Sequence, residues 1–216
     1  HAPPPWTQKT ESFFAMDITS LESLRSLYAS ARERSVKKEL RQLDVHCTRF
    51  ISLSPLVVIS SSGASGALDA SPRGGEPGFV RVQGHGTLLI PDAPGNNRLD
   101  TLENIVQTGQ VGLLFFVPGM DETLRVNGKA ALSTHAAELD ACKDAKRTPK
   151  LVIRVAVEAA YLHCAKALMR SALWDASRHV ERSVMPSMGE MMKDQIGGDI
   201  PCETQEEMLV RYATDL

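Results

Sequence analysis

An arginine set among glycine and proline is suited to holding an anion, and the stretch Ser71-Pro72-Arg73-Gly74 has that composition. We expect it to lie in a loop, residues 69–80, between two strands. Because hydrogen bonds between ionised groups are the stronger ones, the Arg73 guanidinium and the amides after it could receive a phosphate or carboxylate. A solvated arginine in a surface turn is the alternative interpretation.

A second candidate anion site lies in the segment LLIPDAPGNNRLDTLENI, residues 88–105. Asn96 or Asn97 is expected to cap a helix over residues 97–107. Free amides at a helix start favour an anion, so Arg98 in the first turn is electrostatically misplaced there. A bound phosphate would remove that conflict. Asparagine capping beside an exposed Arg98 is the alternative.

A third signal is the alternation in ETLRVNGKAAL, residues 122–132, which predicts a strand with one polar face. Leu124 and Val126 fall on the apolar side. The other side carries three polar residues, Thr123, Arg125 and Asn127. A ligand-contacting face and an ordinary solvent-exposed face both fit this pattern.

The fourth signal is a stripe of residues at helical spacing in HCAKALMRSALWD, residues 163–175. The stripe consists of His163, Lys166, Arg170 and Trp174. On the opposite side, Ala165, Leu168 and Ala172 are expected to pack inward. Two cations and an aromatic ring could clamp a phosphate and cover a flat ligand. A solvated Lys/Arg face anchored by Trp174 is the alternative.

The elements that must position these residues are mainly strands. Strand-like runs are predicted at residues 56–61, 79–82, 87–91, 111–117, 122–132 and 151–157. Helices are predicted from Thr19, from Ser35 through Phe50, at 97–107 with Leu99, Leu102 and Val106 inward, and again after residue 160. Six strands with one inserted helix and flanking helices favour an antiparallel barrel or sheet over alternating parallel units.

A chain of 216 residues with 43% hydrophobic and 23% charged residues is typical of one globular domain. Residues 16–216 are predicted to form it. Residues 1–15, with three consecutive prolines, are predicted to be a poorly ordered extension or a tag remnant. The net charge of −2 argues against a dedicated nucleic-acid surface, and no apolar run is long enough for a membrane span.

Several classes of site are excluded because the sequence lacks the required residues at the required spacing. The four cysteines show no zinc-like pairing and are expected to be reduced thiols in a cytoplasmic protein. The six histidines form no metal-binding pair on a helix, so no metal is predicted. Gly128-Lys129 resembles the end of a phosphate loop, but Ala130 replaces the required hydroxyl. No nucleophile elbow or dinucleotide loop is found.

Four segments together resemble the flavin-mononucleotide (FMN)-binding split barrels related to pyridoxamine 5'-phosphate oxidase. These segments are SPRGGEPGFV, LLIPDAPGNNRLDTLENI, VGLLFFVPGMDETLRVNG and HCAKALMRSALWD. The resemblance covers residues 16 to about 195 and is closest to a subgroup of predicted flavoproteins. It implies a six-stranded antiparallel split barrel and a homodimer with FMN at the subunit interface.

The resemblance also implies roles for the candidate residues. Ser71 to Gly74 would border the flavin, the Asn96-Asn97-Arg98 turn would hold its phosphate, and the polar face with Thr123 and Arg125 would meet its ring. The helical stripe of Lys166, Arg170 and Trp174 could add charge and an aromatic cover, from the same subunit or across the dimer interface. Ile90, in the strand before the turn, is also assigned to the cofactor site.

The implied activity is that of an FMN-dependent oxidoreductase acting on a small molecule, with catalytic residues unassigned because the flavin carries the electron chemistry. Oxidation of vitamin B6 is not expected. Pyridoxamine phosphate oxidases bind their substrate with an Arg-x-His-x-Arg element near the C-terminus, and Arg178-His179-Val180-Glu181-Arg182 lacks that spacing. A flavin-binding or storage protein without turnover is the alternative, and a haem-handling split barrel is a remoter one.

Overall fold

The computed structural model describes residues 17–198 and 201–213. The prediction for residues 1–15 lies outside the described residues. The chain divides into two units, residues 1–38 and residues 39–216. A single domain over 16–216 therefore stays a prediction.

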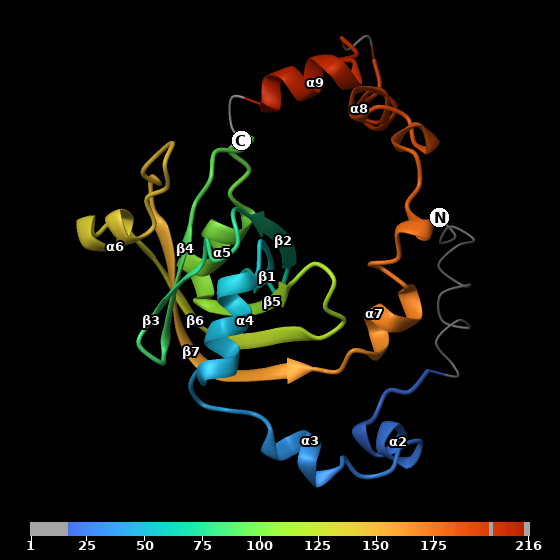
Figure 1. The fold of residues 1–216 in the computed structure, drawn as a ribbon. Helices are drawn as coiled ribbons and strands as arrows, with labels where there is room; N and C mark the ends of the chain where they lie inside the picture. Colours follow the sequence, from blue (N-terminus) through green and yellow to red (C-terminus); the bar gives the residue numbers. More distant parts are fainter. Residues whose placement is uncertain (1–16, 199–200, 214–216) are drawn as a thin grey trace, which may run out of the picture. The chain divides into compact units, whose positions relative to one another are not determined.

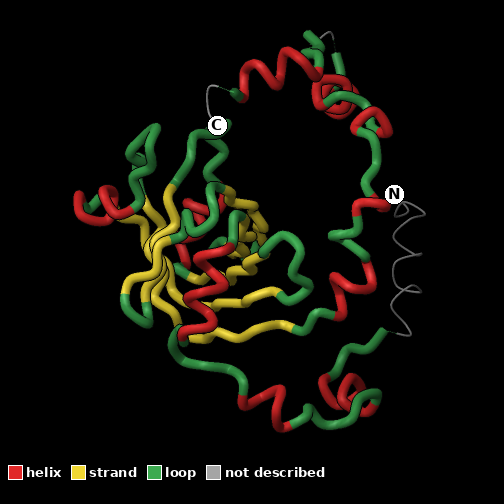
Figure 2. The backbone as a smooth tube through the Cα atoms, in the orientation of Figure 1, coloured by secondary structure: helices red, strands yellow, loops and turns green. Residues whose placement is uncertain are grey.

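One antiparallel sheet forms the centre of the second unit (Figures 1 and 2). Its seven strands are β1 (Leu56–Ser62), β2 (Leu68–Gly74), β3 (Arg81–Gln83), β4 (Thr87–Pro91), β5 (Gln110–Phe116), β6 (Thr123–Ser133) and β7 (Val152–His163). They are ordered β2-β1-β5-β6-β7-β4-β3. The predicted mainly β fold with flanking helices is confirmed, with seven strands instead of six.

The seventh strand is β2, which lies where a loop was predicted. Leu68–Gly74 pairs antiparallel with β1 over seven residues, from Leu56 opposite Gly74 to Ser62 opposite Leu68. A proline is tolerated here because β2 is an edge strand, where a missing N–H costs no ladder hydrogen bond on the open side. The loop prediction for residues 69–80 was therefore wrong in its first half.

Alternation along the strands builds the core. In β1 Val57 and Ile59 are fully buried, and in β6 Leu124 and Val126 are fully buried. These side chains share one cluster with Phe115 of β5. The face that they form is called the inner face below, and the opposite side of β1, β5 and β6 is called the outer face.

Two helices pack against this core. Helix α4 (Val45–Leu53) buries Cys47, Phe50 and Ile51, and its N-cap Asp44 accepts a hydrogen bond from the Cys47 amide at 2.7 Å. The predicted continuous helix from Ser35 to Phe50 was wrong. It is interrupted because the Leu40 backbone pairs with Ala160 of β7, between α3 (Glu33–Lys37) and α4.

Helix α5 (Asp100–Thr108) buries Thr101, Leu102 and Ile105. The prediction that Leu99 and Val106 point inward was wrong: their exposed fractions are 46% and 74%. Leu99 precedes the first helical residue, which is Asp100 and not residue 97, and Val106 lies on the solvent side. Gly109 ends the helix with a left-handed backbone (φ 66°).

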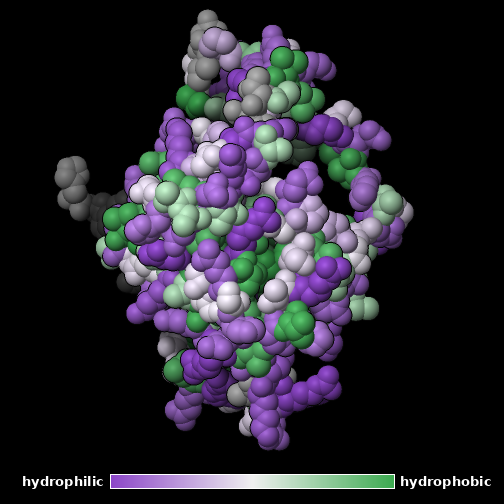
Figure 3. All heavy atoms as spheres, turned by 60° about the vertical axis from the view of Figure 1, so that its left-hand side comes forward, coloured by the Kyte–Doolittle hydropathy of each residue, from purple (hydrophilic) through white to green (hydrophobic). Residues whose placement is uncertain are grey.

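The other helices are short. Helix α2 (Leu21–Ser26) is capped by Ser20 and not by the predicted Thr19. The remaining elements are α6 (Ala136–Ala141), α7 (Lys166–Ser171), the 3-10 turns η1 (Ala176–Arg178) and η2 (Arg182–Val184), α8 (Met188–Ile196) and α9 (Gln205–Tyr212). Among the described residues, no helix combines the length and the apolar composition that a membrane span requires. Hydrophilic residues cover most of the face in Figure 3.

Candidate functional site

The four residues Ser71 to Gly74 divide between the two faces of β2. Ser71 lies opposite Ile59 and Arg73 opposite Val57, whose side chains are fully buried on the inner face. Directly opposed residues of an antiparallel pair point to the same side of the sheet. Ser71 and Arg73 therefore point to the inner face, whereas Pro72 and Gly74 lie on the outer face.

Arg73 meets a carboxylate that the sequence reasoning missed. Its Nη1 lies 3.4 Å from Oδ1 of Asp92, the residue after β4, and each side chain is 20% exposed. We call Ser71, Arg73 and Asp92 the seam, because they connect β2 at one edge of the sheet with the end of β4 near the other. Burial raises the pKa of Asp92, and the charges of Arg73 and Lys150 oppose that rise.

One donor in the seam is unused. Arg73 Nε is buried and has no hydrogen-bond partner among the described residues. A buried donor without an acceptor is costly, and guanidinium groups pair with carboxylates and phosphates through two adjacent N–H groups. The Arg73 guanidinium therefore has capacity for a further anionic acceptor.

The turn before α5 differs from its predicted geometry. Asn96 Oδ1 accepts a hydrogen bond from the Arg98 amide at 3.0 Å, and Asn97 has a left-handed backbone (φ 60°). Neither asparagine caps the helix, because the N-cap position is Leu99, which makes no side-chain cap. The capping prediction was wrong, and Arg98 lies before the helix instead of in its first turn.

The electrostatic conflict expected at Arg98 is absent for the same reason. Its Nε donates to Asp100 Oδ2 at 2.5 Å, and its side chain is 78% exposed. That hydrogen bond raises the pKa of Arg98, with a smaller contribution from Asp69 of β2. Asp100 and Glu103 supply the negative charge that the helix start favours.

Asp69 joins β2 to α5 and is a second carboxylate that the sequence reasoning missed. Thr101 Oγ1 donates to Asp69 Oδ2 at 2.5 Å. Because Asp69 lies opposite Ser61, it shares the inner side of β2 with Arg73. A usable signal was present: Asp69, Ser71 and Arg73 alternate as a strand requires.

The outer face carries the polar residues predicted on β6, with one exception. Arg125 and Asn127 are exposed there, as predicted, while Thr123 is buried at 4% exposure. Thr123 is the register partner of His163 at the end of β7. Arg125 Nη1 donates to the Tyr161 hydroxyl at 3.1 Å and lies 5.8 Å from the centre of that ring.

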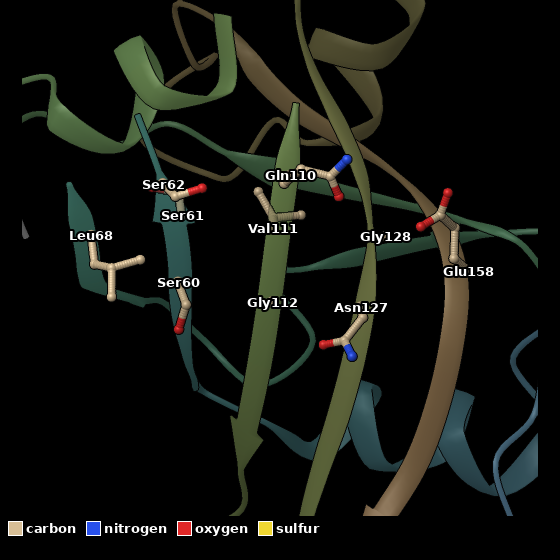
Figure 4. Close-up of a pocket in the computed structure, with 10 residues that line it drawn as sticks. All are labelled: Ser60, Ser61, Ser62, Leu68, Gln110, Val111, Gly112, Asn127, Gly128 and Glu158. Carbon is tan, nitrogen blue, oxygen red and sulfur yellow. The ribbon is translucent and has the colours of Figure 1, made fainter. Parts of the chain in front are cut away.

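A shallow polar cavity of about 360 Å³ lies on the same sheet (Figure 4). Ser60, Gly112 and Asn127 are register partners across β1, β5 and β6. Figure 4 shows the Asn127 side chain reaching toward Gly112, and a Cβ at Gly112 would lie 3.4 Å from Asn127 Oδ1. The other lining residues are Ser61, Ser62, Leu68, Gln110, Val111, Gly128 and Glu158.

Ile90 has no free surface to offer a ligand. Its side chain is fully buried in the core cluster, and it pairs with Ile153 of β7. Ile90 could therefore contribute to a cofactor site only through its backbone, or by supporting the neighbouring turn.

The predicted stripe of Lys166, Arg170 and Trp174 does not form one helical face. His163 ends β7, α7 spans only Lys166–Ser171, and Ala172 reverses the chain with a left-handed backbone (φ 48°). Lys166 and Arg170 are exposed on α7. Trp174 lies beyond the reversal, where its Nε1 donates to the Met120 carbonyl at 2.8 Å. The stripe prediction was wrong because the helix ends too early.

Within residues 17–198 and 201–213, no group of three or more His, Cys, Asp or Glu side chains is placed to hold a metal ion.

The family model described as pyridoxamine 5'-phosphate oxidase matches residues 43–164. No curated protein matches the chain. Among solved structures, Group A Streptococcus HupZ has a TM-score of 0.47 and 19% identity, and covers 56% of this chain and 93% of its own. A putative pyridoxamine 5'-phosphate oxidase from Lactobacillus delbrueckii has a TM-score of 0.45 and 19% identity (57% and 98% covered).

An FMN-binding protein from Syntrophomonas wolfei has a TM-score of 0.42 and 13% identity, and covers 67% of this chain and 97% of its own. The family match extends from Leu43, before α4, to Cys164, after β7, and so contains every strand of the sheet. It covers more than half of the 216 residues. The chain therefore belongs to the pyridoxamine 5'-phosphate oxidase family.

Proposed function

We propose that this protein binds FMN and acts as an FMN-dependent oxidoreductase. The observation that carries the proposal is the buried, unpartnered Nε of Arg73 in the seam of a chain from this family. A phosphate would give that donor an acceptor, and a second guanidinium, that of Arg98, lies within electrostatic reach of the same strand through Asp69.

Two residues of the seam, together with Arg98, fit a phosphate group. Arg73 would supply a charge-assisted hydrogen bond, Ser71 a hydroxyl on the same side of β2, and Arg98 an exposed surface charge. Asp92 is compatible with an added anion because burial raises its pKa, which eases its neutralisation by a proton. Asn96 and Asn97 would shape the turn that presents Arg98.

The ring of the flavin is assigned to the outer face of a second copy of the chain. Arg73 points to the inner face of the sheet, whereas Arg125 and Asn127 lie on the outer face. One copy thus presents its phosphate-binding and its ring-binding candidates on opposite sides. Two copies that exchange these contributions would complete each site.

The outer face also supports a homodimer. Leu56 pairs with Phe116 and Val58 pairs with Leu114, and all four side chains are only partly covered. Apolar side chains on adjacent strands form a contiguous surface that a second copy would remove from water. Arg125 borders this surface because it is the register partner of Leu114.

FMN, when bound, would supply the electron and hydride chemistry of the reaction. The chain's own residues would bind the phosphate, orient the ring and exclude water at the interface. We also place the protein in a reducing compartment, the cytoplasm, since Cys47, Cys142, Cys164 and Cys202 are all free thiols.

The test is flavin binding followed by reduction. We expect FMN to bind with quenching of its fluorescence, and the bound flavin to bleach with NADPH, NADH or reduced deazaflavin and to reoxidise on adding an acceptor. Failure to bind FMN would overturn the proposal. Tight binding without reduction by any of these donors would replace the oxidoreductase with a flavin-storage protein.

A further inference from the structure

A second cavity, of about 310 Å³, lies away from the seam. Its lining residues come from the loop after β5, from α7 and from the residues that follow α7. The lining residues are Gly119, Asp121, Leu168, Met169, Ala172, Trp174 and Asp175. The family match ends at Cys164, so most of this lining belongs to the part of the chain beyond it.

The cavity is held in shape by hydrogen bonds around Trp174. The Trp174 Nε1 donates to the Met120 carbonyl at 2.8 Å, which fixes the indole against the β5–β6 loop. The left-handed backbone of Ala172 turns the chain so that Trp174 faces back toward α7, and the Ala172 amide donates to the Met169 carbonyl at 3.2 Å.

The lining offers acceptors and no side-chain donor. The indole N–H is already used by the Met120 carbonyl, and Leu168, Met169 and Ala172 are apolar. The remaining polar side chains are the carboxylates of Asp121 and Asp175. The Ser177 hydroxyl and amide lower the pKa of Asp175, so that residue is an anion at neutral pH.

Asp121 makes no side-chain hydrogen bond or ion pair with any residue that the structure describes, although it is half-buried. Lys166 and Arg170 are also on α7, but they do not line the cavity. A ligand that brings a positive charge would give the two carboxylates a counter-ion and a hydrogen-bond donor.

We propose that this cavity binds an organic ammonium ion, with its charged head between Asp121 and Asp175 and its apolar body against Trp174 and Met169. Trp is the best aromatic partner for a cation, and the Met thioether adapts to an apolar surface. The site does not depend on flavin binding, and it would admit an amine as a substrate or an effector.

The experiment uses Trp174 as its own reporter. The sequence contains two tryptophans, Trp6 and Trp174, so Trp6→Phe leaves the emission of Trp174 alone. The full-length protein is titrated with benzylamine, which is protonated at neutral pH, and with benzyl alcohol, its uncharged counterpart. We expect benzylamine to change the emission saturably and to bind roughly tenfold more tightly than the alcohol.

Asp121→Asn and Asp175→Asn should each weaken benzylamine binding by roughly five- to tenfold and leave benzyl alcohol unchanged. Asn retains the ability to cap η1 at position 175, and Asp121→Asn carries the test if the other variant is unstable. Glu122→Gln is the matched control, because Glu122 is an exposed neighbour that does not line the cavity.

Equal binding of the amine and the alcohol, or an equal loss in Glu122→Gln, would overturn the ammonium site. FMN affinity is measured in the same variants and should not change. If the parent protein does not bind FMN, the flavin proposal is wrong, but the ammonium-site proposal is unaffected.

Discussion

The Arg73 guanidinium and the Asp92 carboxylate, 3.4 Å apart, connect strands that are not neighbours in the sheet. Arg73 belongs to β2, the first strand in the order β2-β1-β5-β6-β7-β4-β3, and Asp92 follows β4, the sixth. The pair therefore links the edge strand β2 to the end of β4, which lies one strand short of the opposite edge and is not paired with β2. In the same pair, Arg73 Nε is buried and has no hydrogen-bond partner among the described residues.

Replacing Arg73 tests the phosphate assignment. A charge-assisted hydrogen bond contributes about 1.5–3 kcal/mol, so Arg73→Met should weaken FMN binding by roughly ten- to a hundredfold. Riboflavin, which lacks the phosphate, should bind variant and parent almost equally. Fluorescence quenching with both flavins measures this. Arg81→Met is the control, since Arg81 is exposed, donates to the Gly78 carbonyl and lies outside the seam.

Arg98 should contribute less than Arg73, because its exposed charge is screened by solvent and shared with Asp100. We expect Arg98→Ala to weaken FMN binding by a few-fold to about tenfold, with the difference from the parent shrinking as salt is added. If riboflavin weakens as much as FMN, then Arg98 acts on the ring or on the fold and the phosphate assignment is wrong.

Asp92 should make stability depend on pH. Its pKa is raised in the folded state, mainly by burial, so folding favours the protonated carboxyl. This contribution is fully present below the ordinary Asp value of 3.8 and is lost as the pH rises through the raised pKa. Relative to Asp92→Asn, the parent should thus lose stability on going from acid toward neutral pH.

Melting temperatures of both proteins, recorded between about pH 3 and pH 7, check this sign. Asp140→Asn, at an exposed position of α6, is the control and should run parallel to the parent. A parent that gains stability relative to Asp92→Asn as the pH rises would show that the Arg73 charge outweighs burial.

The dimer prediction is tested on the outer face. Phe116→Asp would place a charge in the apolar surface formed with Leu56 and should convert the dimer to a monomer in light scattering. Val106→Asp, on the exposed side of α5, is a matched apolar-to-acid control and should leave the mass unchanged. A parent protein that is monomeric with FMN bound would contradict the shared-site proposal.

Gly128 should be intolerant of any side chain. Gly128 lies at the register shift that separates it from Asn127 in β6. A Cβ on Gly128 would lie 2.1 Å from the Ala156 carbonyl oxygen. Gly128→Ala should therefore force β6 and β7 apart and destabilise the fold by about 1–3 kcal/mol. Gly95→Ala is the control because a Cβ at Gly95 meets nothing within 4 Å. Denaturant unfolding compares the two.

The sequence by itself determined the local features that depend on near neighbours. The alternation of Leu124 and Val126 with Arg125 and Asn127 was enough to assign the two faces of β6, because successive side chains of a strand point to opposite sides. The four family-like segments were also enough to indicate the family. Helix boundaries were less certain, as at Asp100, since tertiary contacts outweigh weak local preferences.

Only the tertiary structure decided which of these residues meet. The polar segment Leu68–Gly74 becomes a strand because β1 provides a partner and the sheet edge tolerates Pro72. Arg73 finds Asp92 because the fold brings the edge strand β2 close to the end of β4, five strands away in the sheet order, which no local pattern encodes. Trp174 leaves the predicted stripe because Ala172 reverses the chain and the Met120 carbonyl accepts the indole N–H. Each of these outcomes depends on groups distant in sequence, whose contact free energies enter only when the whole fold has formed.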